Sequence, residues 1–254
     1  MHSDALSSTW QQSTPARAAP GLRAGHAHLW LVSLDEPPLP HDRLAGFLDT
    51  DERARAERFR FETHRRRFEA GRGLLRWLVA HYVGVEPALL RWRYGAHGKP
   101  ALHWAQPRPS PEFNLSHSGG WVVIGLALEA PIGVDVEVAR EIPELMELAR
   151  TNFSTGEVRE IQQLHPELQA AGFFACWTRK EAYVKALGAG LSAPLQAFEV
   201  SLDPQRPPTI RSIGGSTAAA EQWSLLGLQP AEGVWLAAAV NLVTAHWQLF
   251  RAGP

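Results

Sequence analysis

The sequence has a single cysteine and no excess of either charge. Cys176 stands alone among 254 residues, so no disulfide can form within the chain, and a reducing compartment suits such a protein. Lysine and arginine number 25 against 26 aspartate and glutamate residues, which gives a net charge of −1. A dedicated nucleic-acid-binding protein normally carries a basic excess, so this class is disfavoured.

Long apolar runs are also missing. No stretch approaches the roughly twenty apolar residues that cross a bilayer, and the N-terminal region lacks the apolar core of a secretory signal. The sequence therefore predicts a cytoplasmic protein. Its apolar fraction of 45% is ordinary for a globular chain with a real core. Residues 1–25 show no periodicity and are rich in Ser, Ala, Pro and Gly, which predicts a flexible N-terminal arm.

One stretch near residue 180 carries much of the functional signal. Residues 173–187 place large apolar side chains at helical spacing, and Gly188 and Gly190 supply the stop. Glu181 and Lys185 are four positions apart, hence on one face of the predicted helix. Most pairs at this spacing are surface ion pairs. A second pair of acidic residues, upstream in the sequence, suggests that Glu181 belongs to a functional site.

This second pair is Asp135 and Glu137, in a predicted strand over residues 131–137. Alternation places both carboxylates on one face, about 7 Å apart along the strand. Solvent-exposed alternation would explain the pattern, but two such carboxylates can also flank a hard divalent cation. With Glu181 brought over from the helix, three oxygen donors would suit Mg²⁺.

Arginines are concentrated in a predicted helical region that begins with an acidic cap at residues 49–52. Any one of them is often part of a solvated helix surface. Nine within 24 residues of a near-neutral protein predict an anion site, for phosphate groups or an acidic protein partner. The nine are Arg53, Arg55, Arg58, Arg60, Arg65, Arg66, Arg67, Arg72 and Arg76.

Two further segments hold polar residues between turn signals. Residues 95–100 form a predicted turn around Lys99, without the longer glycine spacing of a Walker P-loop. Residues 113–120 contain Ser116 and His117 and precede a predicted strand over residues 121–128. A serine nucleophile is one interpretation. We favour a loop whose polar groups bond backbone or an anion, because no Gly-x-Ser-x-Gly elbow surrounds Ser116.

The two parts of the chain align on each other when shifted by 106 residues. Residues 27–84 and 133–190 then share eight identities, the last being Gly84 with Gly190, about twice what chance gives. The order of elements also agrees: strand, capped helix, long helix and glycine stop. The sequence predicts a duplicated α+β unit with a ligand cleft between the halves. We expect the boundaries at residues 26–129 and 130–254.

Four motifs in this order resemble the 4′-phosphopantetheinyl transferases, specifically the larger surfactin-synthetase-activating type with two fused halves. The resemblance covers about residues 28–245. It implies that type's fold, each half being a small sheet packed with a long helix. The motifs are Gly98-Lys99-Pro100, Phe113-Asn114-Leu115-Ser116-His117-Ser118, Ile132-Gly133-Val134-Asp135-Val136-Glu137, and Trp177-Thr178-Arg179-Lys180-Glu181-Ala182-Tyr183-Val184-Lys185 followed by Gly188.

The resemblance implies a transfer reaction. Coenzyme A would lie in the cleft, and Mg²⁺ (or Mn²⁺ in its place) would bridge its pyrophosphate to Asp135, Glu137 and Glu181. A serine of an acyl or peptidyl carrier protein would attack the pantetheine-side phosphorus and release 3′,5′-ADP. Such chemistry needs charge neutralisation and a base near the serine hydroxyl. A monomer is expected, because the halves are fused.

The resemblance also implies roles for single residues. Glu181 would be the base, Lys185 would offset charge on the leaving phosphate, and Glu157 matches an acidic position that serves as base or as structural support. Glu52 stands where the family often has a basic residue, so contacts to the 3′-phosphate could be fewer. The implied coenzyme A ligands are Arg55, Arg67, Lys99, Pro100, Ser116, His117 and Lys185.

Three alternatives remain at this point. A coenzyme A-binding protein without transferase activity would keep the pocket, although it would have little use for three clustered carboxylates. A metal-dependent phosphohydrolase would act without a carrier, but no second metal cluster is visible. A nucleic-acid-binding module on the arginine-rich face conflicts with the neutral net charge.

Overall fold

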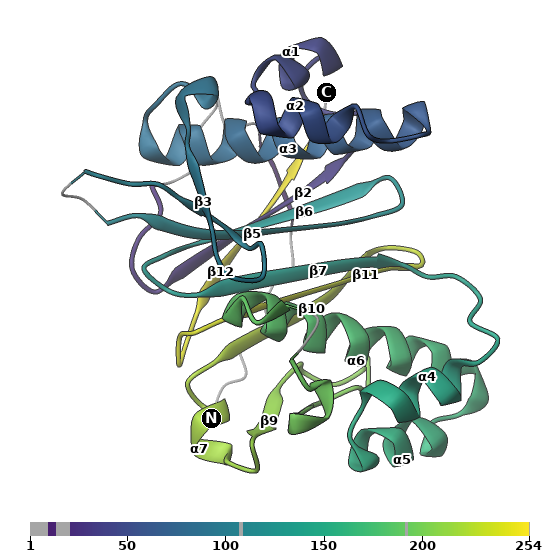
Figure 1. The fold of residues 1–254 in the computed structure, drawn as a ribbon. Coiled ribbons are helices and arrows are strands. Elements are labelled where there is room, and N and C mark those ends of the chain that lie inside the picture. Colours follow the sequence, from purple (N-terminus) through teal and green to yellow (C-terminus); the bar gives the residue numbers. More distant parts are fainter. Residues whose placement is uncertain (1–9, 14–20, 107–108, 191–192, 254) are drawn as a thin grey trace.

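Two β-sheets lie face to face, and a long helix covers the outer face of each (Figure 1). The computed structural model describes residues 10–13, 21–106, 109–190 and 193–253. The resulting four layers run helix, sheet, sheet, helix. This confirms the predicted α+β class, with one small sheet and one long helix in each half.

The first half contains the upper sheet and helix of Figure 1. Its sheet has the order β2-β6-β5, and neighbouring strands are antiparallel. Apolar residues of α3, such as Leu74 and Leu78, pack against Trp30 and Ile124 of the sheet. The elements are β2 His26–Ser33, α1 His41–Gly46, α2 Thr50–Ala56, α3 Glu62–Val83, η2 Pro87–Leu89, β3 Trp92–Tyr94, β4 Pro100–Leu102, β5 Pro111–Ser118 and β6 Trp121–Leu128.

The second half repeats this plan. Its sheet has the order β10-β11-β7, again antiparallel, and α6 covers it with Phe173, Phe174 and Val184. The elements are β7 Ile132–Val138, α4 Leu145–Asn152, α5 Thr155–Gln163, α6 Pro166–Leu187, η4 Leu195–Ala197, β8 Phe198–Val200, β9 Ile210–Ile213, α7 Thr217–Ala220, β10 Ser224–Ala231 and β11 Val234–Val240.

The long helices correct the register of the internal repeat. Helices α3 and α6 both have 22 residues. Each ends at a glycine in the left-handed region, Gly84 with φ 67° and Gly188 with φ 66°, a backbone conformation that favours glycine. These helices are therefore offset by 104 residues. The alignment of Gly84 with Gly190 was wrong by two positions, because the connection before α6 is shorter than the one before α3.

Both halves also contain the same buried ion pair. Helix α2 begins with a capping box made by Asp49 and Glu52, and α5 with one made by Ser154 and Glu157. Glu52 then accepts from Arg76 of α3. Glu157 forms the equivalent pair with Lys180 of α6, at 2.8 Å, with both side chains inaccessible to solvent.

The chain ends cross over to the first sheet. Strand β12, His246–Ala252, pairs in parallel with β2, so this segment lies in the first half's sheet although the expected boundary assigns it to the second half. Gln11–Gln12 form β1 and pair in parallel with Phe250 and Arg251 of β12. The flexible arm predicted for residues 1–25 is therefore wrong at these two residues, whose backbone groups complete the edge of β12. Residues 1–9 and 14–20 lie outside the described residues.

Residues 113–118 form a strand, where we expected a loop. They belong to β5, which pairs with β6 through a two-residue turn at Gly119 and Gly120. The polar side chains that suggested a loop have partners on β7, as described below. Among the described residues, no helix combines the length and apolarity needed to cross a membrane.

Candidate active site

The site lies where β5 of the first half meets β7 of the second. These strands belong to different sheets, and side chains of β5 bond directly to β7. Asn114 Oδ1 accepts from the Val134 backbone N at 3.0 Å, and Ser116 Oγ donates to Asp135 Oδ1 at 2.9 Å. These contacts fix the position of one predicted carboxylate relative to the first half.

Ser118 continues this series two residues further along β5. Its Oγ accepts from the Val138 backbone N at 3.1 Å and donates to Glu137 Oε2 at 2.8 Å. Sequence reasoning did not single out Asn114 or Ser118. The signal that could have found them is the alternation of polar residues at 114, 116 and 118, the same period of two that marks the two carboxylates on β7.

Helix α6 brings Glu181 and Lys185 over β7. The close approach requires a glycine at position 133, because a Cβ there would overlap backbone atoms of Ala182 and Ala186 and lie 2.8 Å from the Lys185 carbonyl carbon. Lys185 Nζ lies 2.6 Å from Asp135 Oδ1 and donates to Ser116 Oγ at 3.0 Å. Lys185 therefore joins the helix to both strands.

Glu137 influences the pKa of each of the other two carboxyl groups. Burial raises the pKa of Asp135 to about 6, Lys185 and Ser116 oppose this, and Glu137 adds to it. Burial also raises the pKa of Glu181, with Lys185 lowering it and Glu137 raising it. Glu137 thus acts on both of the other carboxyl groups, which places all three within electrostatic reach.

A divalent cation fits this set of donors, although the set is not closed around one point. Within the described ranges, no three His, Cys, Asp or Glu side chains converge as ligands, and the Lys185 ammonium lies 2.6 Å from Asp135 Oδ1. The other oxygen, Asp135 Oδ2, is buried without a hydrogen-bond partner. An unpartnered buried carboxylate oxygen is costly, and a hard cation would satisfy it.

Basic groups gather at the end of β5. Burial lowers the pKa of His117, Lys185 and Arg55 lower it further, and Glu137 raises it. His117 therefore lies within electrostatic reach of both cations. Arg55 is exposed on α2, with its guanidinium 5.3 Å from the centre of the Phe68 ring. Of the predicted coenzyme A ligands, the structure brings together Arg55, His117, Ser116 and Lys185.

Arg67 is already partnered. Its Nε and Nη2 bond the two carboxylate oxygens of Asp35 at 3.0 and 2.9 Å. The pair covers the β5–β6 turn, since a Cβ on Gly120 would lie 3.5 Å from Arg67 Nη2. Arg67 is thus placed near His117, but a phosphate would have to compete with Asp35 for it.

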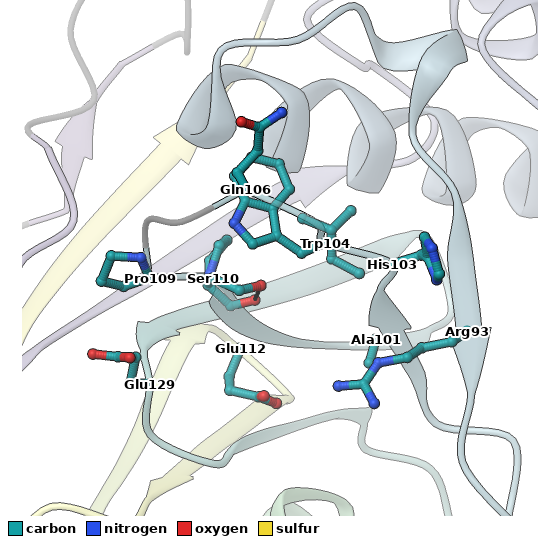
Figure 2. A pocket seen from close by; sticks show the side chains of 11 residues that line it. Arg93, Ala101, His103, Trp104, Gln106, Pro109, Ser110, Glu112 and Glu129 are labelled. Atoms are coloured by element: carbon teal, nitrogen blue, oxygen red, sulfur yellow. Dashed lines mark hydrogen bonds between the residues drawn. The ribbon is translucent and has the colours of Figure 1, made fainter.

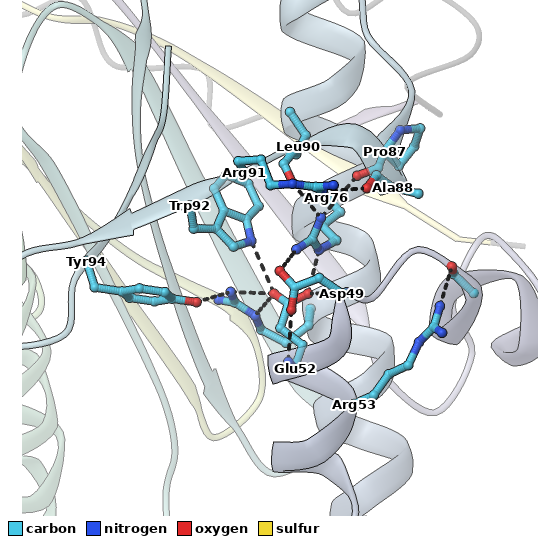
Figure 3. Close-up of polar contacts among 12 residues, drawn as sticks. Asp49, Glu52, Arg53, Arg76, Pro87, Ala88, Leu90, Arg91, Trp92 and Tyr94 are labelled. Carbon is cyan, nitrogen blue, oxygen red and sulfur yellow. Dashed lines mark hydrogen bonds and ion pairs between the residues drawn. The ribbon is translucent and has the colours of Figure 1, made fainter.

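Two arginines of the run, Arg72 and Arg76, pair with an internal carboxylate. Five others remain exposed and accessible to an anion: Arg53, Arg55, Arg58, Arg60 and Arg66. Glu52 is 4% exposed and accepts from Arg72 Nε at 2.8 Å, from Trp92 Nε1 at 3.2 Å and from Arg76 (Figure 3). Arg76 is fully buried and also donates to the Leu90 carbonyl at 3.1 Å. Glu52 therefore pairs with both arginines, and Asp49 is a second carboxylate partner of Arg76.

Lys99 and Pro100 lie at a junction of the halves. Lys99 Nζ donates to the carbonyls of Ala186 at 2.9 Å and Ile132 at 3.1 Å, so its ammonium group ties the 95–100 turn to α6 and β7. Beside it is a cavity of about 350 Å³ lined by residues of both halves, including Pro100 and Gly188. Pro100 thus lies at the cavity wall, whereas the Lys99 ammonium is bonded to carbonyl groups.

A second cavity, of about 670 Å³, adjoins the first and shares Arg93, Ala101 and Glu112 with it. Figure 2 shows the Arg93 guanidinium and the Glu112 and Glu129 carboxylates around this space, with Trp104 on the opposite wall. Because the two cavities share Arg93, Ala101 and Glu112, they form one groove beside β4 and the start of β5. Ser116 and His117, at the other end of β5, do not line it.

Glu157 is not part of this group. Its carboxylate accepts from the backbone N of Ser154 and of Val200, both at 2.8 Å, and pairs with Lys180. It is 1% exposed. Since Lys180 in turn donates to the carbonyls of Leu195 and Phe198, the geometry supports the structural alternative for Glu157 rather than the catalytic one.

Comparisons with known proteins agree with this arrangement. Residues 39–128 match the model of the N-terminal part of 4′-phosphopantetheinyl transferases, and residues 131–239 that of the 4′-phosphopantetheinyl transferase superfamily. The 4′-phosphopantetheinyl transferase HetI of Nostoc sp. is 38% identical over 96% of this chain and 97% of its own length. The transferase Sfp of Bacillus subtilis is 30% identical over 64% of this chain and 70% of its own.

Two further comparisons are weaker. A putative 4′-phosphopantetheinyl transferase of Synechocystis sp., slr0495, is 37% identical over 66% of this chain and 67% of its own length. The crystal structure of the Thermotoga maritima holo-[acyl-carrier-protein] synthase covers 44% of this chain and 62% of its own, with 18% identity and a TM-score of 0.35, a likeness too low to argue from. The identity with HetI extends across both halves, and this chain therefore belongs to the 4′-phosphopantetheinyl transferase superfamily as an enzyme of the two-half type.

Proposed function

We propose that this enzyme transfers the 4′-phosphopantetheine group of coenzyme A to a serine of an acyl or peptidyl carrier protein in a Mg²⁺-dependent reaction that releases 3′,5′-ADP. The observation that supports this most directly is the ion pair between Lys185 of α6 and Asp135 of β7 at 2.6 Å, with Glu181 of the same helix within electrostatic reach of Lys185 and Glu137. We also propose that it acts as a monomer in the cytoplasm.

The groove suits coenzyme A. Its adenosine end would occupy the cavity at Pro100 and Gly188, and Ser116, His117 and Arg55 would bind phosphate groups at the end of β5. We assign Lys99 a supporting role there, since its ammonium group holds carbonyls of β7 and α6. Arg67 would assist if phosphate displaced Asp35.

Asp135, Glu137 and Glu181 would hold the cation. When bound, Mg²⁺ would neutralise charge on the pyrophosphate and polarise the phosphorus. Asp135 Oδ2 supports this assignment, because it is buried and has no hydrogen-bond partner. Mn²⁺ has similar ligand preferences and could take its place.

Glu181 would take the proton from the carrier serine, directly or through a water. The serine oxygen forms a bond to the pantetheine-side phosphorus, and the bond from that phosphorus to the 3′,5′-ADP oxygen breaks. Lys185 would offset the charge that develops on the leaving phosphate. The Lys185 ammonium bonds both Ser116, a proposed phosphate ligand, and Asp135, a proposed metal ligand, which supports this role.

The test is intact-mass analysis of an apo carrier protein incubated with enzyme, coenzyme A and Mg²⁺. We expect the mass to rise by one phosphopantetheine group. Glu181→Gln should lower the rate by a factor of about 10²–10⁴ and retain coenzyme A binding. The control is Glu160→Gln, at an exposed ion pair with Arg211, which should leave both the rate and the binding unchanged. Absence of an adduct on several acyl and peptidyl carriers, with coenzyme A still bound, would favour a non-catalytic binding protein.

A further inference from the structure

Ser118 uses its hydroxyl in two directions. The oxygen accepts from the Val138 backbone N at 3.1 Å, and the hydrogen goes to Glu137 Oε2 at 2.8 Å. Because the backbone donor fixes where the oxygen lone pair points, the O–H can serve the carboxylate alone. Glu137 is the more exposed of the two β7 carboxylates, with 24% of its side chain accessible against 4% for Asp135. It therefore depends more on a single strong partner for a fixed orientation.

A second serine–carboxylate hydrogen bond, between Ser116 and Asp135, lies two residues earlier on both strands. Ser116 bonds one oxygen of Asp135 and leaves Oδ2 without a partner. Ser118 bonds one oxygen of the Glu137 carboxylate, and the one other ion-pair or hydrogen-bond partner of this carboxylate among the described residues is Arg140, at 3.7 Å from the same oxygen. Two serines at a spacing of two thus hold two carboxylates at a spacing of two. Each carboxylate is left with one oxygen available to a ligand.

We propose that Ser118 is a positioning residue that holds the Glu137 carboxylate in the orientation required to ligate the divalent cation. This inference rests on the proposed cation site. Glu137 has three rotatable side-chain bonds, and without Ser118 its carboxylate would be free to turn toward Arg140 and solvent. Loss of a hydrogen bond to a ligating carboxylate typically lowers metal affinity by about 10–100-fold.

The experiment titrates Mn²⁺ into the full-length protein with coenzyme A bound and no carrier present, and follows free Mn²⁺ by its electron paramagnetic resonance signal. Ser118→Ala should raise the dissociation constant for Mn²⁺ by about 10–100-fold, and Ser118→Thr, which keeps the hydroxyl, should restore it. Ser33→Ala is the matched control, because Ser33 Oγ only accepts from the Glu36 backbone N at 3.2 Å. Melting curves identify any variant that fails to fold, and Ser118→Cys then replaces Ser118→Ala.

A double-mutant cycle separates positioning from other roles. In a Glu137→Gln background, Ser118→Ala should change Mn²⁺ affinity little, because the group that Ser118 orients no longer binds metal. The proposal is overturned if Ser118→Ala weakens Mn²⁺ binding equally in the wild-type and Glu137→Gln backgrounds. It is also overturned if the Glu137→Gln single variant binds Mn²⁺ as tightly as the wild type. Failure of the wild-type protein to modify any carrier would instead overturn the proposed function.

Discussion

The buried pair of Glu157 and Lys180 allows a sharp test of structural against catalytic roles. We expect Glu157→Gln to destabilise the enzyme strongly while leaving its chemistry intact. Both side chains are inaccessible to solvent. Gln can retain one acceptor for the backbone donors of Ser154 and Val200, but it leaves the Lys180 charge uncompensated in the core.

The structure sets the size of this effect. Removing one partner of a buried ion pair costs about 3–5 kcal/mol, and Lys180 keeps only neutral acceptors, the carbonyls of Leu195 and Phe198. For a chain of about this size, 1 kcal/mol shifts the melting temperature by about 2–4 °C. The expected loss is therefore about 6–20 °C. Glu52→Gln in the equivalent pair of the first half should cause a smaller loss, because Arg76 keeps the Asp49 carboxylate as a charged partner.

The assay combines calorimetric melting with initial rates of carrier modification at a temperature where the variant is folded. We expect a large fall in melting temperature and a turnover within a few fold of the wild type. The opposite result, a turnover reduced by 10² or more with an unchanged melting temperature, would refute the structural assignment and return Glu157 to the candidates for the base.

Three further outcomes follow from the packing. Gly133→Ala should push α6 away from β7 and cost about 1–3 kcal/mol in urea unfolding together with most of the turnover, whereas Gly46→Ala, with open space around its Cβ position, should do neither. Burial, with a smaller effect of His26, lowers the pKa of His28 to about 4, so the unfolded chain binds the extra proton between about pH 6.5 and 4. Stability should then fall by up to about 1.4 kcal/mol per pH unit as the pH drops through this window; a His28→Phe variant with an equally steep slope would contradict this. Lys99→Met should lower the melting temperature while changing the coenzyme A affinity, measured by calorimetry, only slightly. A large loss of affinity with an unchanged melting temperature would restore Lys99 as a phosphate ligand.

The sequence predicted what short-range patterns determine. Alternation identified the strand with Asp135 and Glu137, helical spacing identified the helix with Glu181 and Lys185, and the glycine stop at Gly188 was correct. Each of these signals depends on residues only a few positions apart. At that distance the geometry of a helix or strand determines which side chains lie on the same face.

Other features depended on partners far along the chain. Strand β5 was taken for a loop because Asn114, Ser116 and Ser118 are polar, and their acceptors and donors belong to β7 about 20 residues later. The role of Glu52 was equally hidden, because nothing near it in sequence shows that Arg76, 24 positions on, would be buried beside it. Lys99 likewise finds its carbonyl partner Ala186 at a separation of 87 residues.

Strand β12 has a consequence for how the protein is made. It lies between β1 and β2, so the sheet of the first half lacks a strand until the chain has been synthesised to Ala252. Phe250, which stacks on Trp30 at 4.5 Å between ring centres, is absent from the first core until the ribosome has passed residue 250. The first half can therefore complete its folding only after residues 246–252 have left the ribosome, and a gene split near residue 130 would encode two fragments that need each other to become stable.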